Sequence, residues 1–180
     1  MIPALLALVA CLRLPASDSD SAAESAGAFD PAALPSGPSP CRNPLFVQVL
    51  DTKDGDTLAV VDEADVEIDV RLIGADAPEI DHGSEPAECW GTEAAEFTAT
   101  ALLGKQVWLT FDQECVDLYA RSLAYVHLGA GADDFFNARL LREGHATVLP
   151  IPPNNTFADS FLEAQVEARG AGRSMWGACL

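Results

Sequence analysis

The sequence predicts an α+β domain in which five short strands and three helices share one core. Residues 45–72 contain β-rich runs separated by turn residues, which is typical of an antiparallel meander. Later segments carry apolar residues at helical spacing, with glycines where the helices should end. Residues 41–180 are enough for one domain of this kind, and no internal repeat is visible.

Five segments have the composition of strands. Residues 45–50 are β-rich and run into a turn at Asp54-Gly55, and a second strand is expected over residues 57–61. Residues 66–72 alternate apolar and polar side chains, as a half-buried strand does. The last two strands are expected over residues 106–111 and 121–128.

Three segments are expected to be helical, and they cover residues 92–103, 133–142 and 157–169. In the first of them Phe97 and Ala101 fall on one face. Thr92 is a possible N-cap for this helix, and Gly104 gives it a stop.

The first 40 residues differ from the rest of the chain. Residues 1–11 are short and apolar, and Leu8-Val9-Ala10-Cys11 resembles a bacterial lipobox, in which Cys11 would carry a lipid. No lysine or arginine precedes this stretch, so a conventionally cleaved signal that discards Cys11 stays open as an alternative. Residues 12–40 are rich in Ser, Ala, Pro and Asp, which predicts a disordered tether. We therefore expect an exported protein, anchored through Cys11 or else secreted or periplasmic.

The cysteines support export. Apart from Cys11, four remain, and none has the Cys-x-x-Cys spacing of a metal site. Cys41 precedes the first strand and Cys179 is the penultimate residue, and the termini of a domain are often close together. We therefore predict the bridges Cys41–Cys179 and Cys89–Cys115, with four free thiols in a cytosolic protein as the alternative.

The chain is strongly acidic, with a formal net charge of −18. Lysine occurs only at Lys53 and Lys105. A nucleic-acid backbone should be repelled at long range, so the charge argues against tight and unassisted binding of such a partner. It does not argue against turnover, since bound cation and salt reduce the repulsion.

One ordered set of residues carries the chemistry. The turn Asp54-Gly55-Asp56-Thr57 is followed by Arg71, by Asp76-Ala77-Pro78-Glu79 and by Arg121, which lies two residues after Tyr119. These residues offer acidic oxygens for a hard cation, arginines for an anionic substrate and a carboxylate that could activate water. A metal-dependent phosphodiesterase needs these parts.

This set resembles the staphylococcal nuclease (thermonuclease) family, and the resemblance runs from about residue 45 to residue 176. It is supported by Leu141-Arg142-Glu143-Gly144-His145-Ala146 and by Pro153-Asn154-Asn155-Thr156. The resemblance implies an OB-fold, a five-stranded β-barrel with three packed helices. It also implies a bacterial exported homologue of that family.

The resemblance implies a Ca²⁺ site in this chain. Asp56 and Asp76 would supply carboxylates, and Ala77 would supply its backbone carbonyl. Asp54 would orient a ligand or a water molecule from behind these groups.

The resemblance also assigns catalytic roles. Glu79 would be the general base or would position the attacking water. Arg71 and Arg121 would grip the scissile phosphate and stabilise charge that develops on its oxygens. Tyr119 matches a tyrosine near the terminal phosphate of the substrate.

Several positions depart from the family pattern. Leu118 stands where a lysine is usual, and Ala120 stands where a glycine is usual. Leu149-Pro150-Ile151-Pro152 lacks the tyrosines that line a nucleotide pocket in the family. We expect intact chemistry with weaker contacts to the sugar, base and terminal phosphate.

The leading interpretation is a monomeric Ca²⁺-dependent nuclease that cleaves DNA and RNA, both endo- and exonucleolytically, and leaves 3′-phosphates. The alternative is a non-catalytic OB-fold module that recognises a basic protein or nucleic acid. Retention of Asp56, Asp76, Glu79 and both arginines favours the enzyme. The acidity of the chain is the feature that favours the binding module.

Overall fold

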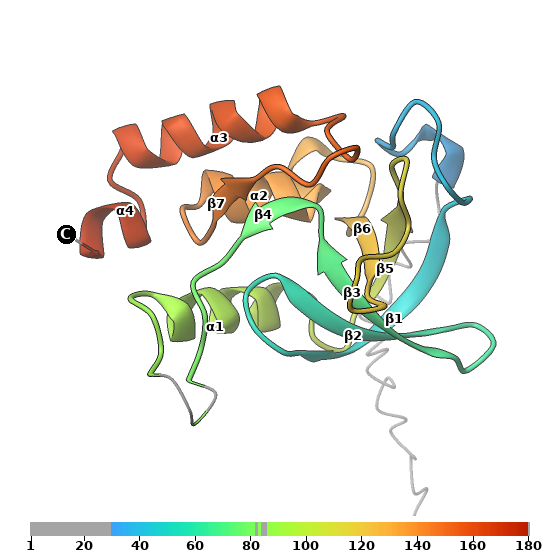
Figure 1. Ribbon diagram of the computed structural model, residues 1–180, viewed down its shortest axis with the longest axis horizontal. Helices are drawn as coiled ribbons and strands as arrows, with labels where there is room; N and C mark the ends of the chain where they lie inside the picture. The colour runs from blue at the N-terminus through green and yellow to red at the C-terminus, as the bar shows by residue number, and fades with distance from the viewer. Residues whose placement is uncertain (1–29, 82, 84–85, 180) are drawn as a thin grey trace, which may run out of the picture.

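A computed structural model describes residues 30–179 except 82 and 84–85. Five strands close into a barrel in the order β1-β2-β3-β6-β5, with β3 and β6 parallel and the other neighbours antiparallel. These strands are β1 (Leu45–Thr52), β2 (Thr57–Asp62), β3 (Glu67–Leu72), β5 (Gln106–Thr110) and β6 (Ser122–His127). The barrel and its packed helices (Figure 1) confirm the predicted OB-fold of the α+β class.

The predicted helices are present with shifted ends. They are α1 (Gly91–Leu102), α2 (Phe136–Arg142) and α3 (Ala158–Gly170). The expected cap Thr92 is wrong, because α1 already begins at Gly91 after Trp90, whose φ is 74°. The first residues of the second predicted helix instead form a separate 3-10 turn, η2 (Ala132–Asp134).

Four further short elements were not predicted. They are the strands β4 (Gly74–Asp76) and β7 (Thr147–Leu149), which pair as a small antiparallel sheet, the helix α4 (Met175–Ala178) and the 3-10 turn η1 (Pro31–Ala33). Each spans three or four residues, which is too short for a periodic pattern to reveal. The β4–β7 sheet matters because β4 follows β3 closely and ends at Asp76, so its pairing with β7 fixes the backbone of Asp76.

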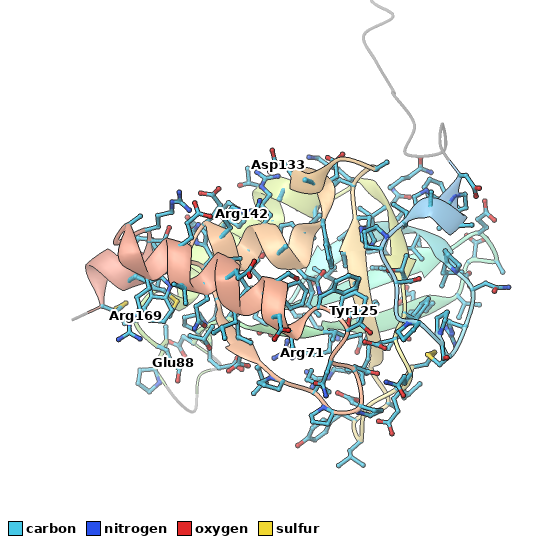
Figure 2. All side chains as sticks on the ribbon, turned by 90° about the horizontal axis from the view of Figure 1, so that it is seen from above. Arg71, Glu88, Tyr125, Asp133, Arg142 and Arg169 are labelled. Atoms are coloured by element: carbon cyan, nitrogen blue, oxygen red, sulfur yellow. A yellow bond between two sulfur atoms is a disulfide. The ribbon has the colours of Figure 1, made fainter. Side chains whose placement is uncertain are left out.

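The core lies inside the barrel and continues beneath the helices. Val47 and Val49 of β1 point inward and are 2% and 1% exposed, because alternate side chains of a strand face opposite sides. On β6 every residue is buried, since α2 lies against this strand and Asn137 accepts a hydrogen bond from the backbone N–H of Val126. Tyr125 of β6 (Figure 2) packs edge-on against Phe157 at 4.8 Å between ring centroids.

The disulfides are Cys41–Cys115 and Cys89–Cys179, with Cα–Cα separations of 5.7 and 5.9 Å. The predicted pairing Cys41–Cys179 and Cys89–Cys115 is therefore wrong, although the same four cysteines are paired. The assumption that the domain termini are neighbours fails here. The start of the described chain lies at the β5 end of the barrel, and the C-terminus lies beside α4 at the other end (Figure 1).

The expected tether extends less far than residue 40. Residues 30–41 form a strap, defined by these positions, that lies against β5 and the residues after it. Leu34 is 4% exposed, the N–H of Gly37 donates to the carbonyl of Phe111 at 2.9 Å, and the Thr110 hydroxyl donates to the carbonyl of Pro35 at 2.6 Å. The composition of this segment, poor in large apolar groups, led us to expect disorder. The strap is ordered because Leu34 is buried and because hydrogen bonds to its backbone hold it against the barrel.

The predictions for residues 1–11, for Cys11 and for most of the tether fall on residues 1–29, outside the described part of the chain. Across the residues that the structure does describe, no helix has the length and apolar character needed to cross a membrane.

Candidate active site

The turn between β1 and β2 is shaped by Asp54. Its carboxylate accepts hydrogen bonds from the backbone N–H groups of Asp56 at 2.8 Å and Thr57 at 2.7 Å. The carbonyl of Gly55 accepts from the Thr98 hydroxyl of α1 at 2.7 Å. A Cβ at Gly55 would overlap the side chain of Ala77, so only glycine lets this turn approach β4 so closely.

Asp56 links this turn to the chain that follows β4. One carboxylate oxygen accepts from the N–H of Ala77 at 2.6 Å, and the other accepts from the Thr57 hydroxyl at 3.1 Å. Burial raises the pKa of Asp56 to about 7, against the lowering effect of the Arg71 guanidinium nearby. A positive charge close to Asp56 would therefore stabilise the ionised form of this carboxylate.

Arg71 stands near the end of β3 and is 7% exposed. Its guanidinium lies 3.1 Å from an Asp56 carboxylate oxygen and donates to Asp76 at 2.8 Å. It also donates to the backbone carbonyls of Leu72, at 3.0 Å, and Ala75. The arginine therefore holds both predicted metal-binding carboxylates in one cluster, which we call the acid–arginine cluster (Asp56, Arg71 and Asp76).

The donor set of this cluster fits a hard cation. Its side-chain donors are carboxylate oxygens, which Ca²⁺ prefers, and no sulfur or imidazole donor belongs to it. The described residues contain no group of three or more His, Cys, Asp and Glu side chains placed to hold a metal. Backbone carbonyls, such as that of Ala77, and water would have to complete the coordination.

Glu79 lies three residues after β4, and its side chain is exposed. Its backbone is held on both sides by Glu88. The N–H of Glu79 donates to the Glu88 carboxylate at 3.0 Å, and the N–H of Glu88 donates to the carbonyl of Glu79 at 2.9 Å. In the view from above (Figure 2), Arg71 and Glu88 are both labelled in the lower half of the picture, and Asp133 and Arg142 in the upper half.

Arg121 directly precedes β6, which pairs in parallel with β3. The register sets Arg71 opposite Leu123, so Arg121 enters the strand that neighbours the strand of Arg71. The Nε of Arg121 donates to Asp117 at 2.8 Å, and its guanidinium carbon lies 5.4 Å from the centre of the Tyr119 ring. Tyr119 is 81% exposed and free to meet a ligand.

Asp117 fixes the loop that carries Arg121. Its carboxylate also accepts from the backbone N–H groups of Tyr119 and Arg121, both at 2.9 Å. Partial burial raises the pKa of Asp117, but the hydrogen bonds from Arg121 and Tyr119 outweigh it and leave the pKa below its usual value. Ala120 has a φ of 64°, which is a left-handed conformation that favours glycine. This chain therefore carries alanine at a position where the backbone suits the glycine that is usual in the family.

Two contacts of the site escaped sequence reasoning. Glu88 and Asp117 are single acids in loops, and nothing in the spacing of Glu88 distinguishes it from the many other acids of this chain. Asp117 could have been suspected from its place four residues before Arg121.

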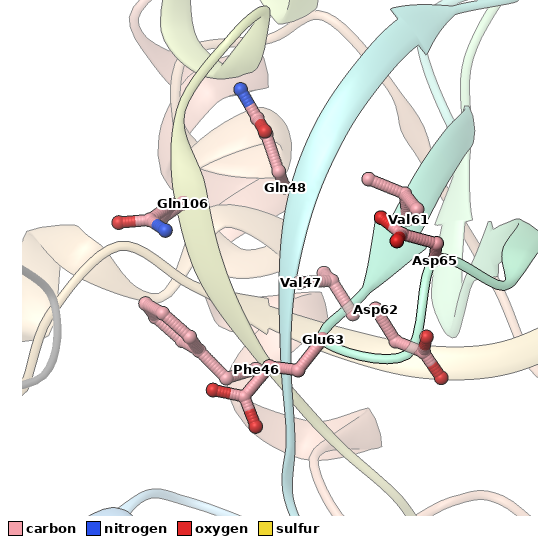
Figure 3. Close-up of a pocket in the computed structure, with 8 residues that line it drawn as sticks. All are labelled: Phe46, Val47, Gln48, Val61, Asp62, Glu63, Asp65 and Gln106. Carbon is pink, nitrogen blue, oxygen red and sulfur yellow. The ribbon is translucent and has the colours of Figure 1, made fainter.

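A separate pocket of about 160 Å³ opens on the outer face of the barrel, at the end of the β1–β2 hairpin opposite Asp56 (Figure 3). Its lining includes Phe46, Gln48, Asp62, Glu63, Asp65 and Gln106. This pocket lies away from the acid–arginine cluster and takes no part in it.

A small barrel with two acids and a buried arginine at one end, and a second arginine directly before the neighbouring strand, has the make-up of a phosphodiesterase. The sequence profile described as "Staphylococcal nuclease homologue" matches residues 69–178. The chain belongs to the staphylococcal nuclease family.

Three relatives illustrate the match. A protein named thermonuclease from Staphylococcus intermedius is 38% identical over 123 residues, which cover 68% of this chain and 71% of the relative. A thermonuclease from Staphylococcus hyicus is 34% identical over 134 residues, covering 74% and 77%. A probable endonuclease of Saccharomyces cerevisiae is 31% identical over 116 residues, covering 61% and 41%. The family and these names support a nuclease in general.

Proposed function

We propose that this protein is a Ca²⁺-dependent nuclease that hydrolyses DNA, RNA or both to products with 3′-phosphates. The acid–arginine cluster carries the proposal. It brings together Asp56 from the turn after β1, Arg71 from β3 and Asp76 from β4. Asp56 and Arg71 are buried, and the side chain of Asp76 is half exposed. Arg121, directly before the adjacent strand β6, supplies a second guanidinium for the phosphate oxygens.

Ca²⁺ would be held by Asp56, Asp76 and the backbone carbonyl of Ala77, while Asp54 shapes the turn behind them. When bound, it would supply positive charge next to the phosphate. The raised pKa of Asp56 supports this assignment, because a buried carboxylate with only one arginine for two acids lacks full compensation.

In the proposed hydrolysis, Glu79 and the two arginines have different roles. Glu79 takes a proton from a water molecule, whose oxygen forms a bond to phosphorus. Arg71 and Arg121 each donate to phosphate oxygens and stabilise the negative charge that grows there. The bond between phosphorus and the 5′ oxygen breaks, the 5′ oxygen takes up a proton, and the phosphate stays on the 3′ side.

Other parts of the proposal concern the setting of the enzyme. Two disulfides support export, since such bridges persist in oxidising compartments. The proposal includes lipid anchoring through Cys11, or else secretion or a periplasmic location. It also includes a monomeric state.

A non-catalytic module that binds a basic protein or nucleic acid is the second candidate. The net charge of −18 favours it, because it suits a basic partner better than a polyanion. The two candidates differ in whether a folded, Ca²⁺-binding chain turns over substrate.

Cleavage of fluorescent single-stranded DNA by the full oxidised chain tests the proposal, with Ca²⁺ and with EDTA. We expect cleavage only with Ca²⁺, and Glu79→Gln should lower kcat at least 100-fold while the affinity for Ca²⁺ stays nearly unchanged. Arg71→Lys should be similarly slow, because an ammonium cannot reproduce the planar fork of the guanidinium.

Two results would contradict the enzyme. Equal activity of Glu79→Gln and wild type would remove Glu79 from catalysis. No cleavage by a folded chain that binds Ca²⁺ would leave the binding module.

A further inference from the structure

The backbone of Glu79 is held by a reciprocal pair of hydrogen bonds. The Glu88 carboxylate accepts from the N–H of Glu79 at 3.0 Å, and the N–H of Glu88 donates to the Glu79 carbonyl at 2.9 Å. Both partners are exposed to solvent, and both belong to loops rather than to a helix or strand. Only one of the two bonds uses a side chain, so the Glu88 carboxylate can be removed while the N–H of Glu88 stays available for the other bond.

Gly91 provides a third contact to the backbone of Glu79, at its carbonyl group. A Cβ at this position would overlap the carbonyl oxygen and carbon of Glu79, so the start of α1 lies directly against this backbone. The N–H of Gly91 in turn donates to the carbonyl of Glu88 at 3.0 Å. Residues 88–91 thus form a short segment, which we call the Glu88 turn, that contacts the backbone of Glu79.

The Glu88 turn is itself fixed to other parts of the fold. Cys89 is bonded to Cys179 beyond α4. The ring N–H of Trp90 donates to Nδ1 of His145 at 3.1 Å, and the ring of His145 stacks on Phe97 of α1 at 4.1 Å between centroids. A disulfide and a hydrogen bond therefore tie the turn to Cys179 and to His145, which is itself packed on α1.

We propose that Glu88 is a positioning residue, whose carboxylate fixes the backbone of Glu79 and so sets where the Glu79 side chain stands relative to the acid–arginine cluster. This inference rests on the proposed function, in which Glu79 activates the water. Displacements of about 1 Å in a catalytic group can lower a rate by roughly two orders of magnitude. The role of Glu88 requires an acceptor oxygen at this place and no negative charge.

The test compares Glu88→Ala with Glu88→Gln in the full oxidised chain, with Ca²⁺ and single-stranded DNA. We expect kcat of Glu88→Ala to fall about tenfold with KM within twofold of wild type. Glu88→Gln keeps an acceptor oxygen and should stay within about threefold of wild type in kcat. Glu163→Ala removes an exposed glutamate of α3 and is the matched control, with kinetics and melting temperature like wild type.

A double-mutant cycle separates positioning from an independent effect. Adding Glu88→Ala to Glu79→Gln should cause no further loss of kcat, because Glu88 acts through the group already removed. An additive loss would overturn the proposal. So would a Glu88→Ala enzyme with the kcat of wild type, or a Glu88→Gln enzyme as slow as Glu88→Ala.

Hydrogen exchange of the Glu79 backbone amide gives a readout that needs no activity. Exchange should be faster in Glu88→Ala than in wild type and should return toward the wild-type rate in Glu88→Gln. If the wild-type chain does not cleave DNA, the proposed function fails, and this amide alone decides whether Glu88 fixes Glu79. Equal exchange rates in all three proteins would refute the positioning role whatever the activity.

Discussion

At the scale of single residues, the site depends on a few groups that do two things at once. Arg71 forms ion pairs with Asp56 and Asp76 and also contacts backbone carbonyls, so it holds the cluster together in the absence of substrate. Asp117 likewise both shapes a loop and directs the Arg121 guanidinium. Substitution of either residue changes structure and chemistry together, which makes single substitutions at these positions hard to interpret.

Ala120 offers a cleaner substitution. Its φ of 64° is unfavourable for a residue with a Cβ, and glycine is the residue that adopts this conformation freely. Ala120→Gly should therefore raise the free energy of unfolding by roughly 0.5–1 kcal/mol, measured by urea denaturation, without slowing cleavage. Ala95→Gly in the interior of α1 is the opposite control and should lower it by about 1 kcal/mol. A less stable Ala120→Gly protein would contradict the strain.

At the scale of elements, a disulfide joins each of two loops next to the proposed site to one end of the domain. Cys115 precedes the loop of Asp117 and Arg121 and is bonded to Cys41 of the strap. Cys89 lies in the Glu88 turn and is bonded to Cys179 after α4. The strap and the C-terminal helix are therefore covalently tied to the loops that carry the proposed catalytic residues, although neither contributes such a residue.

Loss of these bridges should be costly for stability. The sequence separations of 74 and 90 residues give roughly 4.5 kcal/mol each as an upper estimate from loop entropy. Cys41→Ser/Cys115→Ser and Cys89→Ser/Cys179→Ser should each lower the melting temperature by about 10 °C or more. Reduction of the wild-type protein should lower it further than either pair of substitutions. An unchanged melting curve after complete reduction would rule out a stabilising role.

His127 on β6 makes the fold sensitive to acid. It is 1% exposed, lies 2.9 Å from the Thr110 hydroxyl and stacks on Phe135, and burial lowers its pKa to about 4. The unfolded chain takes up a proton near pH 6.5 whereas the folded chain does not, so stability is complete above that pH and falls as the pH drops towards 4.

The loss attributable to this residue should be on the order of 3 kcal/mol between pH 7 and pH 4. Urea denaturation of wild type and His127→Gln over this range measures it, because the variant lacks the titrating ring. The carboxylates, and His145 with its pKa also lowered by burial, contribute equally to both proteins and cancel in the difference. Parallel pH profiles would show that His127 titrates normally in the fold.

At the scale of the whole molecule, the charge opposes the proposed substrate. Five acids on and around the β2–β3 hairpin are wholly or partly exposed, and Lys53 pairs with Asp69 at 2.6 Å. They are Asp62, Glu63, Asp65, Glu67 and Asp69. Approach of a polyanion should therefore be limited by long-range repulsion rather than by the site itself.

A salt series tests this repulsion. Between about 0.01 and 0.15 M salt the screening length falls from roughly 30 to 8 Å, so kcat/KM for DNA should rise several-fold over this range at constant Ca²⁺. Replacement of Asp62, Glu63 and Asp65 by their amides should raise kcat/KM at low salt and flatten the series. A value that falls steadily from the lowest salt would mean that local contacts outweigh the overall charge.

The sequence predicted the barrel well because strands such as residues 66–72 carry an alternating pattern that depends on neighbours alone. It predicted the residues of the acid–arginine cluster because a resemblance ordered them along the chain. It could not give the disulfide pairing, since that depends on which loops the barrel brings to Cys41 and Cys179. Glu88 was missed for the same reason, because its partner is a backbone amide nine residues away.

The two bridges also interlock along the chain, since Cys89 falls between Cys41 and Cys115 while Cys179 falls outside them. Every peptide bond from Cys41 to Cys179 therefore lies within at least one covalent ring. A protease that cuts once anywhere in this span leaves two pieces that remain one molecule until the sulfurs are reduced. On a gel without reductant the nicked protein would run as a single species, and it would retain the parts of its site in one body.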